Sequence, residues 1–366
     1  KSRIGEIITQ NGISYEIKSS YVKDVISLTT TFAGIQKIAN LPIVQYIEPI
    51  GAPPSLDDEQ GISNHRNNAI NTSDNFATGS KLDGSGVTVI IGDDGFVGPH
   101  IDFTGRITNN ATNTATANTH ADHCSGIILG APIFRPRVRG QAPGANLITF
   151  DGYADYNNYP SIYTNDNTRV TSHSLGQTCN SGYTSDARTS DILINNYPLM
   201  NHVHSAGNSG TTTCGGIAGG WRTITGGFKA GKNVLTVANI TKASILSSSS
   251  SKGPTADLRI KPDISAVGTS ITSTQPNNAY SVSTGTSMSC PAIAGGLAVL
   301  TQAYKLKYNN TEPDGALMKA ILLNTADDIG YEGPDFSYGW GRINMLKAVK
   351  CIESGRFLTG QIAQTS

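Results

Sequence analysis

Hydrophobic positions after about residue 85 alternate between the patterns of strands and of helices. Residues 87–91 form a short β-branched run that is typical of a strand buried on both faces of a sheet. Similar runs at 147–150, 169–172, 202–205 and 234–237 predict further strands, and helical segments lie between several of them. This alternation predicts an α/β fold with a mainly parallel central sheet flanked by helices. In such sheets, functional sites form beyond the carboxyl ends of the strands.

The first 50 residues have a different pattern, which predicts a small α+β segment. Alternating apolar positions at 13–17 and 43–47 predict two strands. Between them, residues 32–41 have the apolar spacing of a helix, and Pro42 ends it.

A change in composition separates this segment from the rest of the chain. Proline and acidic residues at 51–62 predict a linker, so the larger domain is expected to span 63–355. Residues 356–366 are interpreted as the start of a further C-terminal segment. The full length of 366 residues is enough for one large domain with a substantial core and one small domain.

One apolar run begins with a serine in a notable place. The heptapeptide G-T-S-M-S-C-P at 285–291 leads directly into apolar residues 292–300, so Ser287 lies at the start of a buried helix. The first turn of a helix has unpaired N–H groups and a partial positive charge. Ser287 could therefore attack a carbonyl group while the helix end stabilises the oxyanion. The alternative is a structural serine that caps the helix.

Composition and charge narrow the function classes. The net charge is zero, 15% of residues are charged, and no basic run occurs, which argues against a nucleic-acid partner. No apolar run reaches the roughly 18 residues of a membrane span. The chain begins Lys1-Ser2-Arg3 without the apolar region of a signal peptide, so an exported protein would have lost its signal or be shown here without it.

Three further motifs could supply the partners that a nucleophilic serine needs, and each has an ordinary structural alternative. Asp93 follows the strand at 87–91, where a turn aspartate is also common. His120 and His123 could ligate a metal, although no third ligand lies nearby, or could simply begin a surface helix. Asn208 follows another strand, and its amide could donate to an oxyanion or stabilise a turn.

The order of these residues resolves the ambiguity of each one. Asp93, His120, Asn208 and Ser287 occur in the chain order of the subtilisin-like serine proteases (subtilases), each within similar surroundings. The D-x-G, H-x-x-H-x-x-G, A-G-N and G-T-S-M-S motifs carry this resemblance, which covers roughly residues 62–350. The resemblance implies a three-layer subtilisin-like fold and serine endopeptidase activity.

The family's catalytic roles can be carried over to matching positions. Ser287 would attack the scissile carbonyl, His120 would act as general base and then general acid, and Asp93 would orient His120. The side chain of Asn208 and the backbone N–H of Ser287 would hold the oxyanion, supported by Thr286. This chemistry requires no metal or cofactor.

The resemblance also implies two walls of a substrate pocket. These are Ser174, Leu175 and Gly176 on one side, in a segment similar to a family strand, and Ser205, Ala206 and Gly207 on the other.

Four of the five cysteines divide into two groups by context, and Cys351 is the fifth. Cys179 and Cys214 lie in polar, Gly-rich loops, which suits a disulfide in an oxidising compartment. In the family these loops flank the substrate pocket, which supports the pairing. Cys124 and Cys290 lie in apolar helical contexts and are predicted to be buried free thiols. The odd count leaves at least one thiol outside any internal disulfide.

Several positions depart from the family pattern. Ala121 and Asp122 replace the usual Gly-Thr after His120, and Asp94 adds a second acid beside Asp93. If Asp122 lies close to His120, it would raise the pKa of that imidazole. A tyrosine-rich stretch, 153–160, replaces the family's small, Gly-rich edge for extended substrate.

The usual calcium site of the family also differs. The loop at 130–137 contains two arginines and no acid, so calcium is not indicated there. Asp102 matches an aspartate ligand of that site, but a turn or salt-bridge role suits it better. A structural calcium ion elsewhere is not excluded by the sequence.

Residues 41–49 resemble the end of a subtilase propeptide, so the N-terminal segment is interpreted as an inhibitor and folding partner of the larger domain. Together these features predict a secreted or cell-surface bacterial endopeptidase that acts on polypeptides. The alternative is a latent or catalytically silent subtilase fold that acts as a binding module. A serine esterase would require G-x-S-x-G and the order Ser, Asp, His, and neither occurs.

Overall fold

The chain forms two compact units, Lys1–Leu56 and Asp57–Ser366, which are considered separately. The structure is a computed structural model. It describes residues 7–10, 12–13, 16–17, 28–47, 59–71, 81–112, 119–164, 166, 168–176, 179 and 182–360. The predicted linker at 51–62 lies outside these residues up to position 58, and the C-terminal segment at 356–366 lies outside them from position 361.

The described part of the N-terminal unit contains a short antiparallel pair, a helical stretch at residues 7–10 and helix α2 (Phe32–Ala39). Strand β1 (Glu16–Ile17) pairs with β2 (Leu28–Thr29). Thr31 is the N-cap of helix α2, and its hydroxyl accepts a hydrogen bond from the N–H of Gly34 at 3.1 Å. The helix predicted at 32–41 is therefore confirmed, ending two residues early.

The second strand predicted for this unit is wrong. Residues 43–47 form turn and extended backbone without a strand, and Tyr46 is 74% exposed. A strand requires a neighbour for its N–H and C=O groups, and alternating apolar residues alone do not supply one. The linker predicted at 51–62 extends too far along the chain. Residues 59–62 belong to helix α3 (Glu59–Asn64), where Ile62 is buried.

The larger unit is built on a parallel sheet of seven strands. In spatial order they are β4 (Ile107–Asn109), β5 (Asn146–Asp151), β3 (Thr88–Asp93), β6 (Val170–His173), β7 (Asn201–Ser205), β8 (Leu235–Ile240) and β9 (Ile264–Val267). Every neighbouring pair is parallel. The five predicted strands are confirmed as β3, β5, β6, β7 and β8. Strands β4 and β9, of three and four residues, were not predicted.

An antiparallel hairpin was also missed. Strands β10 (Ile271–Gln275) and β11 (Ala279–Ser283) pair outside the main sheet. Asn277 and Asn278 turn the chain between them with φ of 61° each, a conformation that asparagine tolerates better than most residues.

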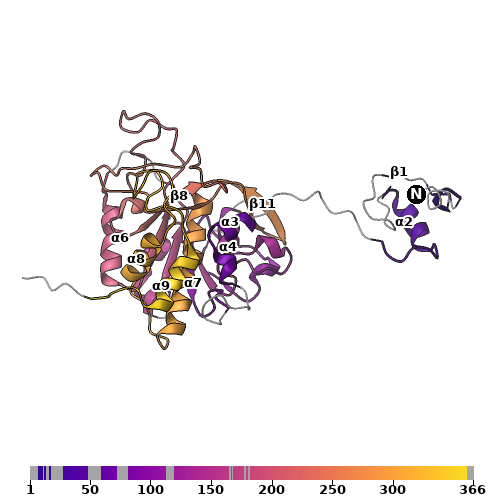
Figure 1. The fold of residues 1–366 in the computed structure, drawn as a ribbon, viewed down its shortest axis with the longest axis horizontal. Coiled ribbons are helices and arrows are strands. Elements are labelled where there is room, and N and C mark those ends of the chain that lie inside the picture. The colour runs from indigo at the N-terminus through magenta and orange to yellow at the C-terminus, as the bar shows by residue number, and fades with distance from the viewer. Residues whose placement is uncertain are drawn as a thin grey trace, which may run out of the picture. The chain divides into compact units, whose positions relative to one another are not determined.

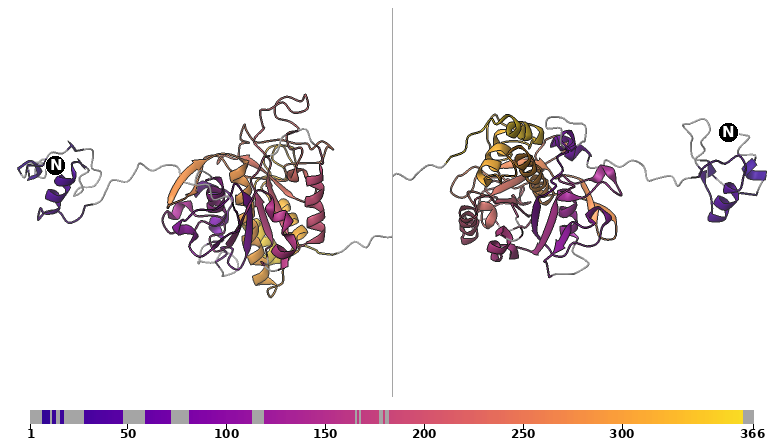
Figure 2. Two further views of the ribbon diagram at one scale, coloured as in Figure 1. Left: turned by 180° about the vertical axis from the view of Figure 1, so that it is seen from behind. Right: turned by 90° about the horizontal axis from the view of Figure 1, so that it is seen from below.

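Helices cover both faces of the sheet, so the fold has the three layers that were predicted (Figure 1). Helices α4 (His120–Leu129), α7 (Thr286–Lys307), α8 (Gly315–Asn324) and α9 (Met345–Ser354) lie on one face, and α5 (Tyr159–Thr164) and α6 (Ser185–Asn196) lie on the other (Figures 1 and 2). Short 3₁₀ helices are η1 (Asn67–Ala69), η2 (Ile101–Phe103), η3 (Pro136–Val138), η4 (Ala154–Asn157) and η5 (Phe228–Ala230). Within the described residues, no helix has the length and apolar character that a membrane crossing needs.

Strand β3 shows how both faces of the sheet are filled. Val89 and Ile91 point into the main core with α4 and α7, whereas Ile90 belongs to a smaller cluster with Ile162 of α5. Because successive strand residues face opposite sides, a β-branched run of this kind serves both layers.

A buried charge cluster fixes β9 against its neighbours. The carboxylate of Asp263 accepts a hydrogen bond from the ammonium of Lys261, lies 3.2 Å from Nζ of Lys319 and accepts the N–H of Thr236 at 2.7 Å. Burial opposes ionisation, but the two lysines lower the pKa of Asp263 overall. The carboxylate is therefore the counter-charge that makes burial of Lys261 tolerable.

We expect Asp263→Asn to lower the free energy of unfolding by about 3–5 kcal/mol, because it leaves the buried Lys261 without its counter-ion. Denaturant unfolding followed by circular dichroism measures this. Asp257→Asn is the matched control, since Asp257 is half exposed and pairs with Arg259 at 2.8 Å. It should cost less than about 1 kcal/mol, and equal losses in both variants would contradict the role of Asp263.

Candidate active site

The order of the strands points to one crevice at the carboxyl edge of the sheet. Strand β3 is flanked by β5 on one side and β6 on the other, so successive chain segments leave it in opposite directions. Ligand sites of parallel sheets form at such switch points. Asp93 ends β3, Ser174 follows β6, and Asn208 lies three residues beyond β7.

Asp93 and His120 are in direct contact. Asp93 is 2% exposed, and its Oδ1 lies 2.6 Å from Nδ1 of His120, the first residue of α4. The same oxygen accepts the N–H of Asp94 at 2.8 Å, which fixes the carboxylate at the end of the strand. The other imidazole nitrogen, Nε2, lies 4.0 Å from Sγ of Cys124.

The two additional acids hold the backbone around His120. The carboxylate of Asp94 accepts the N–H groups of His120 and Ala121 at 3.3 and 2.9 Å, so it caps α4 from outside the helix. Asp122 accepts the N–H of Gly98 at 2.8 Å. Burial, with a smaller contribution from Asp94, raises the pKa of Asp122 to about 6. Asp94 and Asp122, the two acids that depart from the family motif, thus both accept backbone N–H groups at or near the start of α4.

Helix α7 presents Ser287 in its first turn. Thr286 begins the helix, and most of its 22 residues are buried. Pro291 has no N–H to bond the carbonyl of Ser287 four residues earlier. That carbonyl instead accepts the hydroxyl of Ser174 at 2.9 Å and the thiol of Cys124 at 3.3 Å. A break in the helical pattern therefore ties the serine to β6 and α4.

The hydroxyl of Ser287 donates to the carbonyl of Ser174 at 3.3 Å. Among the described residues, no hydrogen bond joins it to His120. Cys124 contacts both residues, because its Sγ lies 3.8 Å from Nδ1 of His120 and 3.3 Å from the backbone carbonyl of Ser287. Catalytic hydrogen bonds are often long without substrate and tighten when it binds.

Asn208 is oriented by Thr286. Its Oδ1 accepts the backbone N–H of Thr286 at 3.0 Å and the hydroxyl at 3.1 Å, and this hydroxyl accepts the N–H of Gly207 at 3.1 Å. Asn208 is an exposed residue, and its Nδ2 lies beside the start of α7, where a Cβ atom on Gly285 would be 3.3 Å from it. Thr286 thus positions Asn208 by direct contacts.

The neighbours of His120 favour its charged form. Cys124 and the Asp93 carboxylate raise the pKa of His120, while burial opposes them. Burial also raises the pKa of Cys124, so its thiol is neutral near pH 7. The Asp93 carboxylate is therefore the charge that acts on His120 in that range. The carboxylate of Asp122 accepts the N–H of Gly98, and Asp122 is not among the groups that shift the pKa of His120.

Two places in this region contain residue types that can bind a metal ion. Asp93, His120 and Cys124 place ligand atoms within 4.8 Å of one another, but they are also the candidate catalytic group. Asp102, which matches a family calcium ligand, accepts the N–H of Phe134 at 3.2 Å and the hydroxyl of Tyr280 at 2.6 Å. These bonds support its interpretation as a turn acid.

The two predicted pocket walls are adjacent because β6 and β7 are paired, with His173 opposite His204. Residues 174–176 continue beyond β6 without strand structure, contrary to the expectation that they form a strand. Opposite them, Ser205 ends β7 and is followed by Ala206 and Gly207.

The tyrosine-rich stretch folds inward. The hydroxyl of Tyr156 bonds Nε2 of His204 at 2.9 Å, Tyr159 is 1% exposed, and the ring of Tyr153 packs on Phe228 with centroids 4.2 Å apart. Tyr159 is therefore a core residue, whereas Tyr153 and Tyr156 are partly buried and pack against other aromatic rings.

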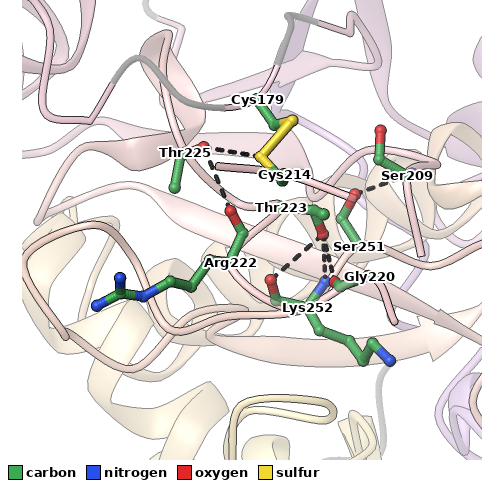
Figure 3. The surroundings of a disulfide bond; sticks show 9 residues. All are labelled: Cys179, Ser209, Cys214, Gly220, Arg222, Thr223, Thr225, Ser251 and Lys252. Carbon is green, nitrogen blue, oxygen red and sulfur yellow. Dashed lines mark hydrogen bonds between the residues drawn. A yellow bond between two sulfur atoms is a disulfide. The ribbon is translucent and has the colours of Figure 1, made fainter. Parts of the chain in front are cut away.

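The predicted disulfide is present. Cys179 and Cys214 are bonded and link the loop after β6 to the loop after β7 (Figure 3). Cys124 and Cys290 are buried free thiols, as predicted, and Cys351 is a half-buried free thiol.

Sequence reasoning missed how the serine is supported. The contacts of Ser174 and Cys124 with the Ser287 carbonyl depend on segments far apart in the chain. Pro291 inside an otherwise helical pattern was the available signal, because a proline always leaves the carbonyl four residues earlier without its helical partner.

A buried aspartate, a histidine bonded to it and a serine at the start of a helix lie at one edge of the parallel sheet of an α/β fold. The chain belongs to the subtilase family, whose model matches residues 84–341, more than half of its length.

Relatives of this chain agree with that assignment. It is 26% identical to thermitase of Thermoactinomyces vulgaris over 73% of this chain and 90% of thermitase. It is 39% identical to C5a peptidase of Streptococcus pyogenes over 35% of this chain, a match that spans only 11% of that protein. The protease domain of PatA, solved as an S218A mutant, has the same fold with a TM-score of 0.62 at 20% identity, covering 75% of this chain and 98% of that one.

We expect Asp93→Asn to lower the pKa of His120 by about 1–3 units, because the imidazolium loses its counter-charge. The pKa of His120 is raised in the folded protein, so the Asp93–His120 pair contributes fully to the free energy of unfolding below pH 6.5, the unfolded pKa. This contribution is lost as the pH rises through the raised pKa. NMR titration of the imidazole measures the shift. Cys124→Ala should change the pKa little near neutral pH, and a larger effect from this variant would show that the thiol is the dominant charge.

Proposed function

We propose that the protein is an endopeptidase whose catalytic triad is Ser287, His120 and Asp93. The observation that carries this proposal is the 2.6 Å contact between the buried Asp93 and His120, at the strand edge where α7 presents Ser287. His120 removes the proton of Ser287 as the hydroxyl attacks the scissile carbonyl, and it later donates that proton to the leaving amine. Asp93 holds the imidazole in the required tautomer and stabilises the imidazolium.

The developing oxyanion is held by Nδ2 of Asn208 and the backbone N–H of Ser287. The first N–H groups of a helix have no partner within it, and the helix dipole adds to their effect. Thr286 keeps the Asn208 amide in the donating orientation through its two hydrogen bonds to Oδ1. The reaction uses only side chains and backbone groups, so no metal or cofactor is needed for it.

Substrate would lie between the segment Ser174, Leu175 and Gly176 and the segment Ser205, Ala206 and Gly207. Their adjacency in the sheet and the contact of Ser174 with Ser287 support this placement. The disulfide between the two following loops would keep the walls at a fixed spacing.

Two wider features belong to the same proposal. The N-terminal unit acts as an inhibitor and folding partner of the larger one, which its propeptide-like sequence at 41–49 supports. The protein is exported by a bacterium, as a disulfide and relatives from bacteria suggest. A structural calcium ion away from the usual family site is compatible with this function.

We expect a fluorophosphonate probe to label Ser287, with Ser287→Ala abolishing both labelling and peptide hydrolysis. Labelling is detected by mass spectrometry of the full chain and of a chain that begins at Asp57, which preserves α3. A well-folded chain from Asp57 that is not labelled would support a silent binding module instead of an enzyme.

Asn208→Ala should lower kcat by about 10²–10³ with little change in KM, because the lost donor acts mainly on the transition state. Steady-state hydrolysis of a peptide p-nitroanilide measures both constants. Ser209→Ala is the matched control, since Ser209 contributes its backbone N–H to Ser251 at 3.1 Å and should retain activity. If Asn208→Ala instead raises KM and leaves kcat unchanged, Asn208 acts in substrate binding and not in stabilising the transition state.

A further inference from the structure

The backbone carbonyl of Ser287 lies at a break in the hydrogen bonding of α7. Pro291 stands four residues later and has no N–H, although the helix continues from Thr286 to Lys307. The groups that bond this carbonyl instead are the hydroxyl of Ser174 at 2.9 Å and the thiol of Cys124 at 3.3 Å. Both come from other elements, so the conformation of Ser287 depends on side chains outside its own helix.

These two donors are unequal. A hydroxyl that donates over 2.9 Å forms an ordinary hydrogen bond, whereas a thiol is a weak donor. Ser174 and Cys124 are both buried, so water competes little for the carbonyl on this side. The hydroxyl of Ser174 is therefore the main substitute for the missing helical N–H.

Ser174 is anchored to the part of the sheet that carries Asp93. It follows β6 directly, and β6 pairs with β3 as far as Gly92. The next residue of β3 is Asp93, which is bonded to His120. Adjacent strands thus hold two parts of the site, because β3 ends in the Asp93–His120 pair and the residue after β6 bonds Ser287.

A second contact joins the two serines in the opposite direction. The hydroxyl of Ser287 donates to the carbonyl of Ser174 at 3.3 Å. That contact must break when Ser287 gives its proton to His120, whereas the bond from the Ser174 hydroxyl to the Ser287 carbonyl can persist. The side chain of Ser174 can therefore hold the nucleophile in place while the reacting bonds change.

We propose that Ser174 is a positioning residue, whose hydroxyl replaces the helical N–H lost at Pro291 and holds Ser287 at the distance from His120 that proton transfer requires. This inference rests on the proposed function, which assigns the nucleophile to Ser287 and the base to His120. It gives the side chain of Ser174 a task separate from that of the backbone of residues 174–176, where the substrate would lie.

The first test is Ser174→Ala, which removes the hydroxyl and leaves the backbone carbonyl in place. We expect kcat for a peptide p-nitroanilide to fall about 10- to 100-fold and KM to stay within about twofold, because displacing a nucleophile slightly lowers the rate of the chemical step. The full chain is used, and active sites are counted by fluorophosphonate labelling. A rise in KM with unchanged kcat would show that this side chain acts in substrate binding, and would overturn the proposal.

Ser172→Ala is the matched control. Ser172 lies two residues earlier and is fully buried, and its Oγ contacts the same helix through Sγ of Cys290 at 3.6 Å instead of the carbonyl of Ser287. Loss of this hydroxyl should leave kcat within about twofold of its original value. An equal fall in kcat in both variants would mean that any hydroxyl lost between β6 and α7 lowers activity, and the specific role of Ser174 would be wrong.

Pro291→Ala supplies a readout that a general loss of packing would not change. Because α7 is continuous, an N–H at position 291 would point toward the carbonyl of Ser287 and provide the bond that Ser174→Ala removes. We therefore expect Ser174→Ala to lower kcat by less than about threefold when it is introduced into the Pro291→Ala chain. If Ser174→Ala costs the same in both backgrounds, the hydroxyl does not replace a helical donor and the proposal is wrong.

The outcomes also separate this inference from the proposed function. If the unaltered chain is neither labelled nor active, the endopeptidase itself is defeated. If the unaltered chain is active and Ser174→Ala retains its kcat, the endopeptidase stands and only the role of Ser174 fails.

Discussion

The close packing of α7 against α4 and the sheet is the constraint on which the site depends. A Cβ atom on Gly295 would lie 2.7 Å from Cβ of Gln141 and 3.0 Å from the carbonyl oxygen of Ile128 in α4, so only glycine permits this approach. Interiors packed at this density transmit the position of one element to the next. The location of Ser287 is consequently a property of the core, and Pro291 then turns its carbonyl toward β6 and α4.

Buried charge is organised around the same framework. Asp93 is almost fully buried and is stabilised by His120 and the N–H of Asp94. In a medium of low polarity, such contacts are stronger than at the surface, and an unpaired group is costly. Asp94 and Asp122 use their carboxylates on backbone N–H groups, so the acidic sequence around His120 mainly builds the entry to α4.

The region beyond the carboxyl ends of β6 and β7 joins three separate parts of the chain. The disulfide ties the loops after β6 and β7, the serine-rich segment before Lys252 pairs with Gly207, and η5 brings Lys229 to the same place.

The sequence alone determined the layered α/β architecture, five strands of the sheet, the disulfide pair and the two buried thiols, because periodicity and local chemistry are readable along the chain. It also placed Asp93, His120, Asn208 and Ser287 through short motifs in a fixed order. It failed at residues 43–47, where strand-like alternation has no pairing partner, and at β10 and β11, whose pairing depends on an Asn-Asn turn.

Only the tertiary structure decided which groups meet. The support of the Ser287 carbonyl by Ser174 and Cys124, and the approach of Lys229 to Gly207, join residues that are 22 to 163 positions apart. Local sequence carries no signal for such contacts, because they arise when helices and strands pack and bring distant segments to one edge of the sheet.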